Sequence, residues 1–212
     1  MKNSNELKRI MRSRKELTKR MDLPIFVGFD DENRSQIVDL AEVGNLFVEG
    51  AIGQGKTDLL HTFAESIYHS PRRVYEGCVV YYIDPKSKAK PAHYLYLYLS
   101  EAEEIAEELE MLCDKIARRT NDPKFARYPV MVLLDDFDSL ATADHHIAEL
   151  LLEIVERGQE VGIHLVLASR PIEGSKIVDK YFYEIYCKIR KKCIFAEIGK
   201  SSPKIELKTA NG

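Results

Sequence analysis

A glycine-rich loop able to surround an anion is the segment of this sequence with the clearest chemistry. Residues 50–57 read Gly-Ala-Ile-Gly-Gln-Gly-Lys-Thr and complete the pattern G-x-x-x-x-G-K-[ST]. In such a loop, backbone N–H groups surround phosphate oxygens, the lysine reaches the β- and γ-phosphates, and the hydroxyl binds Mg²⁺. The pattern therefore predicts ATP and Mg²⁺ as ligands. The predicted nucleotide-binding residues are Gly50, Ala51, Ile52, Gly53, Gln54, Gly55, Lys56, Thr57 and Asp58.

A pair of acids follows the apolar run Val130–Leu134, which has the composition of a strand buried on both faces. Such a strand presents a carboxylate at its carboxyl end, where Asp135 is expected to bind Mg²⁺ together with Thr57. The next residue, Asp136, is placed to orient or deprotonate an attacking water. The alternative is a solvated Asp-Asp turn without a role in chemistry.

A third polar strand end is expected after the apolar run Ile163–Ala168. There Ser169 is predicted to contact the γ-phosphate, so that Lys56, Asp136 and Ser169 form the predicted catalytic set. The alternative for Ser169 is a serine that simply ends a strand. Arg170 has two interpretations, an arginine that serves a nucleotide in a neighbouring subunit or, favoured here, a surface ion pair.

The elements needed to position these side chains are visible in the hydrophobic pattern. A short apolar run precedes the loop and a helix pattern follows it, and further strands are expected at Cys78–Asp84 and at the two runs above. Alternation of strands and helices predicts an α/β fold with a central, mostly parallel sheet and helices on both faces. A helix is expected after Ser100 with a capping box, and another through Ile147–Val155. The tail is expected to hold three extended pieces, Tyr186–Arg190, Cys193–Ile198 and Ile205–Leu207.

The N-terminal region divides into a basic helix and a hairpin. Residues 1–22 are expected to form a basic amphipathic helix or linker, and residues 23–212 the main domain. The favoured interpretation is a solvated helix that covers the edge of the sheet; the alternative is a helix that docks a neighbouring domain or a nucleic-acid backbone. Leu23–Asp39 is predicted to be a β-hairpin.

Composition limits the classes of partner. The chain of 212 residues carries 31 basic and 34 acidic side chains, so its net charge of −3 does not favour nucleic acid or an anionic membrane. Four cysteines without a C-x-x-C pair indicate reduced thiols. With no apolar run near ~20 residues, membrane association would come through missing parts of a longer chain.

Three smaller patterns have structural and functional interpretations. The run Tyr94–Leu99 alternates tyrosine and leucine, which favours an edge strand over a face that stacks a base or grips a partner. His145 and His146 are adjacent and point apart on a helix, so a helix start capped near Thr142 is favoured over a metal site. His164 is expected to be a core histidine.

Several strings together resemble the FtsK/SpoIIIE family of RecA-like P-loop ATPases. They are the loop, Ile83-Asp84-Pro85-Lys86, Asp135-Asp136-Phe137, and the run from Gly162 to Pro171, GIHLVLASRP. The resemblance covers roughly residues 23–200 and is strongest to ATPase modules of EssC-type motors of type VII secretion. It implies hexamer-like assembly with neighbouring ATPase modules or subunits, export of small helical protein substrates, and a cytoplasmic position at the inner face of the cell membrane.

Departures from the family pattern bear on activity. Family members that move DNA usually have Asp-Glu where this chain has Asp135-Asp136, and commonly Gly-Arg where it has Gly158-Gln159. The usual ATQRP ending is also shortened, to Ala168-Ser169-Arg170-Pro171. These changes are consistent with an ATP-binding, weakly hydrolysing secretion module, and DNA is not an expected partner. The alternatives are a DNA translocase motor and a nucleotide-binding interaction module without turnover.

Overall fold

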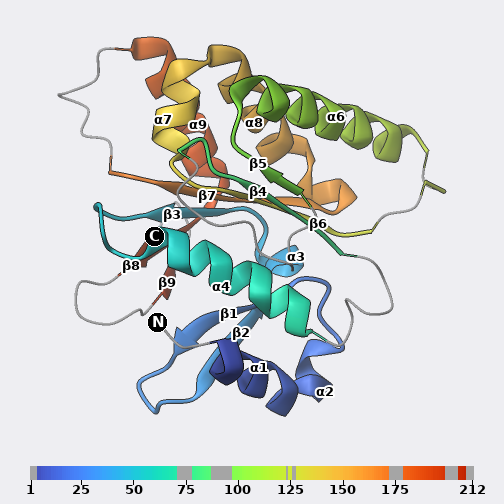
Figure 1. Ribbon diagram of the computed structural model, residues 1–212. Helices are drawn as coiled ribbons and strands as arrows, with labels where there is room; N and C mark the ends of the chain where they lie inside the picture. Colours follow the sequence, from blue (N-terminus) through green and yellow to red (C-terminus); the bar gives the residue numbers. More distant parts are fainter. Residues whose placement is uncertain are drawn as a thin grey trace.

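A parallel β-sheet forms the centre of the computed structural model, which describes residues 4–70, 78–86, 97–122, 124–125, 128–171, 179–198 and 205–208. Within these residues the sheet has seven strands in the order β5-β4-β6-β7-β3-β8-β9 (Figure 1). All neighbouring pairs are parallel except β8 and β9, which are antiparallel. The strands are β3 (Leu46–Glu49), β4 (Val79–Ile83), β5 (Leu97–Leu99), β6 (Val130–Leu134), β7 (Ile163–Ser169), β8 (Ile194–Ile198) and β9 (Ile205–Lys208). The predicted α/β fold with a mostly parallel sheet is confirmed.

Helices cover both faces of this sheet. One face carries α6 (Ala102–Asn121), α7 (Phe137–Ala143), α8 (His145–Arg157) and α9 (Lys180–Lys192), above the strands in Figure 1. The other face carries α4 (Lys56–His69), with the N-terminal elements beneath it. Every residue of β6 and β7 is buried, as expected for central strands covered on both sides.

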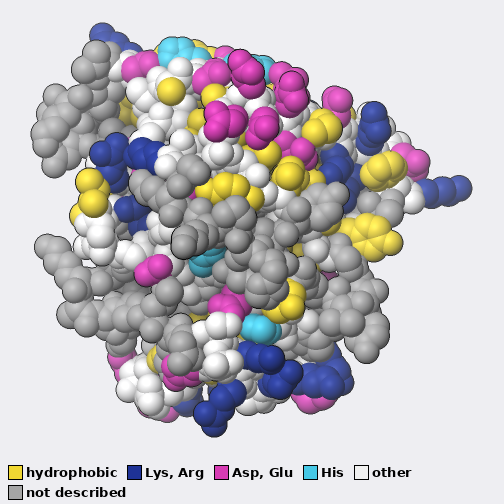
Figure 2. Space-filling view, viewed as in Figure 1, with side chains coloured by type: hydrophobic (Ala, Val, Ile, Leu, Met, Phe, Trp, Pro, Cys, Tyr) yellow, Lys and Arg dark blue, Asp and Glu magenta, His cyan; other side chains and the backbone are white. Residues whose placement is uncertain are grey.

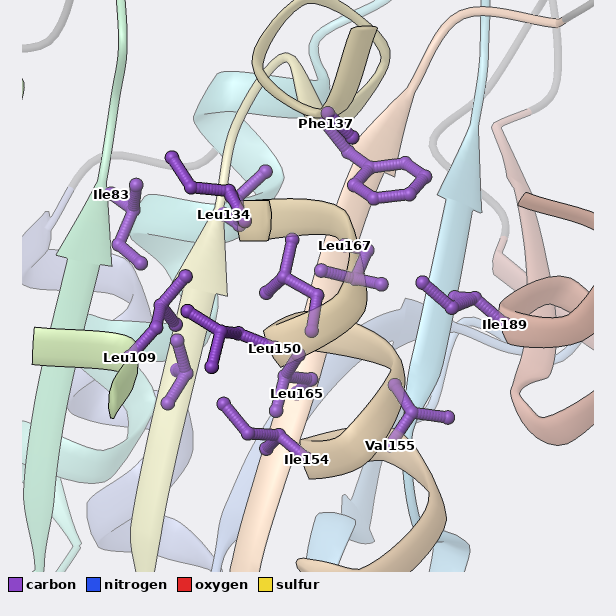
Figure 3. Close-up of a cluster of buried hydrophobic side chains, with 14 of the residues drawn as sticks. Ile83, Leu109, Leu134, Phe137, Leu150, Ile154, Val155, Leu165, Leu167 and Ile189 are labelled. Carbon is purple, nitrogen blue, oxygen red and sulfur yellow. The ribbon is translucent and has the colours of Figure 1, made fainter. Parts of the chain in front are cut away.

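The larger core lies between the sheet and the helices of the upper face. Leu134 and Leu167, from the neighbouring strands β6 and β7, pack with Leu150 and Ile154 of α8 (Figure 3). Phe137 lies directly after the acid pair and is fully buried in the same cluster. Its burial anchors the residues before it, so the chain leaves β6 in one defined direction.

The N-terminal elements form a further small layer that packs against α4. A two-stranded antiparallel sheet joins β1 (Pro24–Phe29) to β2 (Ser35–Asp39), which confirms the predicted hairpin. Three short helices complete this region: α1 (Ser4–Ser13), α2 (Lys15–Thr18) and α3 (Leu40–Val43).

The predicted amphipathic helix is present as α1, but its predicted place over the edge of the main sheet is wrong. The helix is interrupted at Arg14, and α1 buries Leu7 and Met11 against Phe26 and Ile37 of the hairpin. The hairpin exposes an apolar face of its own that the main sheet does not cover. The apolar side of α1 covers that face, and the basic side chains of α1 remain exposed to solvent.

The tail departs from the sequence prediction in one segment. Tyr186–Arg190, expected to be extended, lies within the helix α9. Phe182, Ile185, Tyr186 and Ile189 are buried along α9, at the i, i+3, i+4, i+7 spacing of a helix face. The other two tail strands are confirmed as β8 and β9.

Two predicted helix caps are also corrected. The N-cap of α6 is Glu101 without a side-chain bond, and the Ser100 hydroxyl contacts the Glu101 carboxylate, so no capping box forms. At α8 the cap is Asp144, not Thr142, and its carboxylate accepts from the His146 and Ile147 amides.

The remaining small patterns have mixed outcomes. Leu97–Leu99 is an edge strand as expected, while Tyr94 and Tyr96 lie outside the described residues. The four cysteines are free thiols. No helix among the described residues is long and apolar enough to cross a membrane.

The charges are separated on the surface. Figure 2 shows acidic side chains gathered over the upper helices and basic side chains at the lower end, around α1 and α2. The exposed acids of α6 include Glu103, Glu104, Glu107 and Glu110, and the exposed basic residues of the lower end include Arg9, Arg12, Lys15, Lys19 and Arg20. The net charge of −3 is therefore the sum of an acidic surface over the upper helices and a basic surface around α1 and α2.

Candidate functional site

The glycine-rich loop links the carboxyl end of β3 to the first residue of α4. Gly53 and Gly55 have φ angles of +81° and +84°, in the left-handed region that favours glycine. A Cβ placed on either residue would meet no atom within 4 Å. The loop is therefore open around these two glycines, and the N-terminus of a 14-residue helix begins directly after them.

Lys56 closes the loop on itself. Its ammonium donates hydrogen bonds to the carbonyl oxygens of Gly50, at 2.7 Å, and Ala51, at 3.0 Å. The Gln54 side chain accepts a 2.6 Å hydrogen bond from the Ala51 amide. Two carbonyl oxygens of the loop therefore point at the buried ammonium of Lys56, which lies directly beside the loop.

Thr57 and Asp135 meet across the sheet edge, as expected for two ligands of one cation. The Thr57 hydroxyl donates to Oδ2 of Asp135 at 2.5 Å. Strand order brings them together, since β3 and β6 are separated only by β7. Asp135 is 2% exposed, and burial is the main cause that raises the pKa of its carboxyl; the Thr57 hydrogen bond lowers it, and the charges of Asp136 and Asp84 raise it. A buried carboxylate among like charges suits a hard cation such as Mg²⁺.

Asp136 adopts a left-handed backbone conformation, which is uncommon for non-glycine residues although aspartate tolerates it better than most. Its φ is +54°, and its side chain is largely buried. The carboxylate forms an ion pair with Lys86, whose ammonium lies 3.2 Å from Oδ1. Such strain is found mostly where a side chain must be held in a particular direction.

Ser169 is buried at the end of β7, beside the loop. Its carbonyl oxygen accepts a 3.2 Å hydrogen bond from the Gly50 amide, which ties the two strand ends together. Its hydroxyl lies 3.0 Å from the carbonyl oxygen of Arg170 and 3.5 Å from Oδ1 of Asp138. The structure therefore brings Ser169 to the phosphate loop.

Arg170 forms an ion pair within its own chain. Its Nε lies 2.7 Å from Oδ2 of Asp138, and one terminal nitrogen lies 2.5 Å from the same oxygen. The side chain of Asp138 is 8% exposed and that of Arg170 is 45% exposed. The favoured interpretation of Arg170 as half of an ion pair matches this geometry, although the partner is a buried acid of the site.

Two of the predicted binding residues lie away from the loop interior. Ile52 is an exposed apolar side chain at the outer tip of the loop. Asp58 is exposed in the first turn of α4. Any contact of these two residues with a nucleotide would come from their backbone or from the outer side of the site.

Three residues of the site were not assigned roles by the sequence analysis. Asp138 is the third acid of the segment after β6 and joins α7 to the end of β7. Asp84 is fully buried after β4, where it accepts from the Lys86 amide at 3.1 Å and the Tyr98 hydroxyl at 3.2 Å. Lys86 follows it and reaches Asp136. The signal available for Asp84 and Lys86 was their presence in the Ile83-Asp84-Pro85-Lys86 string.

The core histidine is confirmed, and the two adjacent histidines contact different acids. His164 is buried in β7, and burial lowers its pKa to about 4. His145 contacts Asp179, the N-cap of α9, and His146 contacts Glu110 of α6. No group of three potential metal ligands occurs among the described residues.

A phosphate loop after one strand, a facing acid after a second, and a parallel sheet between two helical layers define a P-loop ATPase fold of the RecA-like type. The sequence matches the FtsK/SpoIIIE family over residues 6–127, more than half of its length. The chain therefore belongs to the FtsK/SpoIIIE family.

Two curated sequence relatives are DNA translocases named FtsK. The protein of Treponema pallidum is 24% identical over 191 residues, and the alignment covers 77% of this chain and 24% of that protein. The protein of Haemophilus influenzae is 24% identical over 196 residues, covering 70% and 37% respectively. The chain thus spans 24% and 37% of the length of these two relatives.

Solved structures with the same fold include type VII secretion ATPases. ATPases 2 and 3 of EccC from Thermomonospora curvata, in complex with a signal sequence peptide, align with a TM-score of 0.65, 16% identity, and coverage of 90% of this chain and 36% of that one. The cytoplasmic domain of EssC aligns with a TM-score of 0.63, 14% identity, and coverage of 94% and 40%. The conjugation coupling protein TcpA with ATPγS aligns at 0.61, with 14% identity and coverage of 86% and 56%. At these identities the likeness establishes the fold.

Proposed function

We propose that this chain is an ATP-binding motor module of a type VII protein secretion system. It binds ATP with Mg²⁺, hydrolyses it weakly, and couples nucleotide state to the docking of a substrate or a neighbouring module. The observation that carries the nucleotide part is the contact between Thr57 and Asp135 beside the open glycine loop. Folds of this kind place an anion at the helix N-terminus and the cation between hydroxyl and carboxylate.

Each side chain has a role that its position supports. The amides from Gly53 to Lys56 bind the phosphates, and Lys56 exchanges its loop carbonyls for the β- and γ-phosphates. Thr57 and Asp135 hold Mg²⁺, whose charge would neutralise the developing negative charge on the phosphates. Asp136 orients or deprotonates the attacking water, and Ser169 contacts the γ-phosphate.

Weak turnover follows from two features of the chain. Asp136 is one methylene shorter than the glutamate usual in DNA-moving members, so its carboxylate reaches less far toward the water. Gln159 occupies the position at which an arginine is common. It lies in η1 (Gln159–Val161), and its side chain lies against Gly44 of the same chain. A Cβ on Gly44 would come within 2.7 Å of the Gln159 side-chain oxygen. A neutral amide there supplies no charge to a nucleotide in a neighbouring subunit.

The partners implied are adjacent ATPase modules or subunits and small helical export substrates. The fold shared with the EccC ATPases, solved with a signal sequence peptide, supports this choice over an isolated nucleotide-binding protein. A place at the inner face of the cell membrane, in a complex anchored elsewhere, is part of the same proposal.

Calorimetric titration with ATP tests the nucleotide site. Wild type is expected to bind ATP more tightly with Mg²⁺ than without it. Lys56→Ala should lose binding by roughly 100-fold, because a charge-assisted contact to two phosphates disappears. Asp135→Ala should lose the Mg²⁺-dependent gain alone. Lys180→Ala, an exposed lysine at the start of α9, is the matched control. Unchanged affinity in Lys56→Ala would exclude this site.

A DNA translocase is the second candidate, favoured by the two FtsK relatives. The exposed basic residues of α1 and α2 would then contact the DNA backbone. DNA affinity that falls steeply with salt, together with DNA-stimulated turnover, would replace the secretion proposal. Absence of single-turnover hydrolysis in a chain that binds ATP would instead favour an interaction module without turnover.

A further inference from the structure

Lys86, which follows β4, contacts the acid pair that follows β6. Strand β4 flanks β6 on the side opposite to β7 and the loop strand β3. The Lys86 ammonium lies 3.2 Å from Oδ1 of Asp136. The carboxylate of Asp136 is thus bonded toward β4, whereas the carboxylate of Asp135 is bonded toward the loop through Thr57. The two adjacent acids are held in opposite directions.

The backbone of Lys86 is itself fixed. The Asp84 carboxylate accepts the Lys86 amide with one oxygen and the Tyr98 hydroxyl of β5 with the other, at 3.1 and 3.2 Å. Asp84 is fully buried, so these bonds form where water does not compete. The lysine therefore starts from a defined position and reaches Asp136 with its flexible stem.

From this geometry we propose that Lys86 is a positioning residue that restrains Asp136 away from the attacking water in the resting protein. This inference rests on the proposed function, in which Asp136 is the group that orients or deprotonates that water. An ion pair with an ammonium holds the carboxylate in one direction and restricts its movement. Turnover requires the ion pair to break so that Asp136 turns toward the phosphate loop.

The ion pair between Lys86 and Asp136 is open to solvent on the lysine side. The side chain of Lys86 is 36% exposed, so water can replace Asp136 as its partner at small cost. Asp136 is held in a left-handed conformation, with its amide donating to Oδ1 of Asp135 at 2.9 Å. A change at Asp135 when it binds a cation would therefore act directly on the residue that Lys86 holds. Nucleotide binding and release of the base are linked through one peptide unit.

The test is a comparison of ATP hydrolysis and ATP binding in the full 212-residue chain. Lys86→Met removes the charge and keeps the stem, and its kcat is expected to rise about two- to fivefold, the range of a partly exposed ion pair. Lys86→Arg should stay near the wild-type kcat because it keeps the charge. Lys180→Met, on an exposed lysine, should leave kcat unchanged. In all three variants the ATP affinity measured by calorimetry should match wild type.

A double variant shows whether the gain depends on Asp136. Lys86→Met combined with Asp136→Asn should hydrolyse no faster than Asp136→Asn alone. A rise that persists in the double variant, a fall of kcat in Lys86→Met, or the absence of a rise would each overturn the restraint. Thermal unfolding of each variant identifies any loss that comes from instability alone.

Measurements of ATP binding distinguish a failure of this inference from a failure of the proposed function. If wild type and Lys86→Met both fail to bind Mg²⁺-ATP, the nucleotide site itself is wrong. If both bind with equal affinity but neither hydrolyses ATP above background, the nucleotide site stands and the restraint is overturned, since removing Lys86 releases no base.

Discussion

The hydroxyl of Thr57 donates a 2.5 Å hydrogen bond to the carboxylate of Asp135, a residue 78 positions further along the chain. Thr57 lies in the first turn of α4, after β3, and Asp135 directly follows β6, with β7 between the two strands. Because parallel strands end at the same edge of the sheet, polar residues that follow them converge there.

Asp135→Asn should make the nucleotide-free protein more stable. Burial raises the pKa of Asp135, so between its ordinary value of 3.8 and the raised value the folded chain holds more protons than the unfolded chain. The free energy of unfolding therefore falls as pH rises through that window, and the cost of the buried charge persists above it. Removing the charge should raise Tm at pH 7 by roughly 2–4 °C.

The same substitution should abolish the Mg²⁺-dependent gain in ATP affinity. Thermal melts at pH 7 without nucleotide, and calorimetry with and without Mg²⁺, measure the two effects separately. A lower Tm together with normal Mg²⁺ dependence would show that Asp135 is a structural acid.

Replacement of Gly55 should strain the loop without a steric clash. A Cβ at this residue meets no atom within 4 Å, but its φ of +84° disfavours side chains. Gly55→Ala is expected to cost roughly 1 kcal/mol of stability, and Gly55→Asn less, because asparagine tolerates this conformation better. Denaturant unfolding measures the difference; equal losses in both variants would indicate that the φ angle is not the cause.

Asp138→Asn should loosen the end of β7. The change removes the charge that holds Arg170 and weakens the contact to the Ser169 hydroxyl. Since Arg170 is partly exposed, the loss of stability is expected to be only roughly 1 kcal/mol. If Ser169 contacts the γ-phosphate, the kcat of Asp138→Asn should fall while its ATP affinity stays at the wild-type value. Asp114→Asn, an exposed acid on α6, is the control; a change of affinity rather than kcat in Asp138→Asn would contradict this coupling.

His164 should contribute to unfolding in acid. Burial lowers its pKa to about 4 from an ordinary 6.5, so between these values the unfolded chain binds the extra proton. Stability is then complete above pH 6.5 and is lost as pH falls toward 4, by roughly 2–4 kcal/mol. His164→Leu should flatten this part of the profile, measured by denaturant unfolding at several pH values. An unchanged slope between pH 6.5 and 4 would assign acid sensitivity to other groups.

Local elements of the site were predictable because neighbouring residues encode them. Strand, loop and helix around Gly53 and Gly55 lie in one short stretch, and glycine is selected at both by the backbone conformation itself. The buried strand before Asp135 is equally visible, since a strand covered on both faces must be apolar throughout. The identity of Thr57 and Asp135 as neighbours then follows from a parallel sheet.

Other features needed packing that no short window contains. The segment around Tyr186 was predicted to be extended, but its apolar residues match a helix face once α9 has α8 and the sheet to cover. The N-terminal helix has an apolar partner because the hairpin, with Phe26, and α4 offer it a surface that the main sheet does not cover. The spacing of apolar residues in the sequence indicates which of them will be buried, and the tertiary structure determines the surface against which they pack.

The sequence alone determined the residue types that could bind phosphate and a cation, and the order of strands and helices that carries them. Only the tertiary structure decided the pairings across strand ends, Lys86 with Asp136 and Arg170 with Asp138. The reason is physical. A charged side chain is compatible with many partners in sequence, and the lateral order of strands in the sheet, set by long-range packing, determines which one it meets.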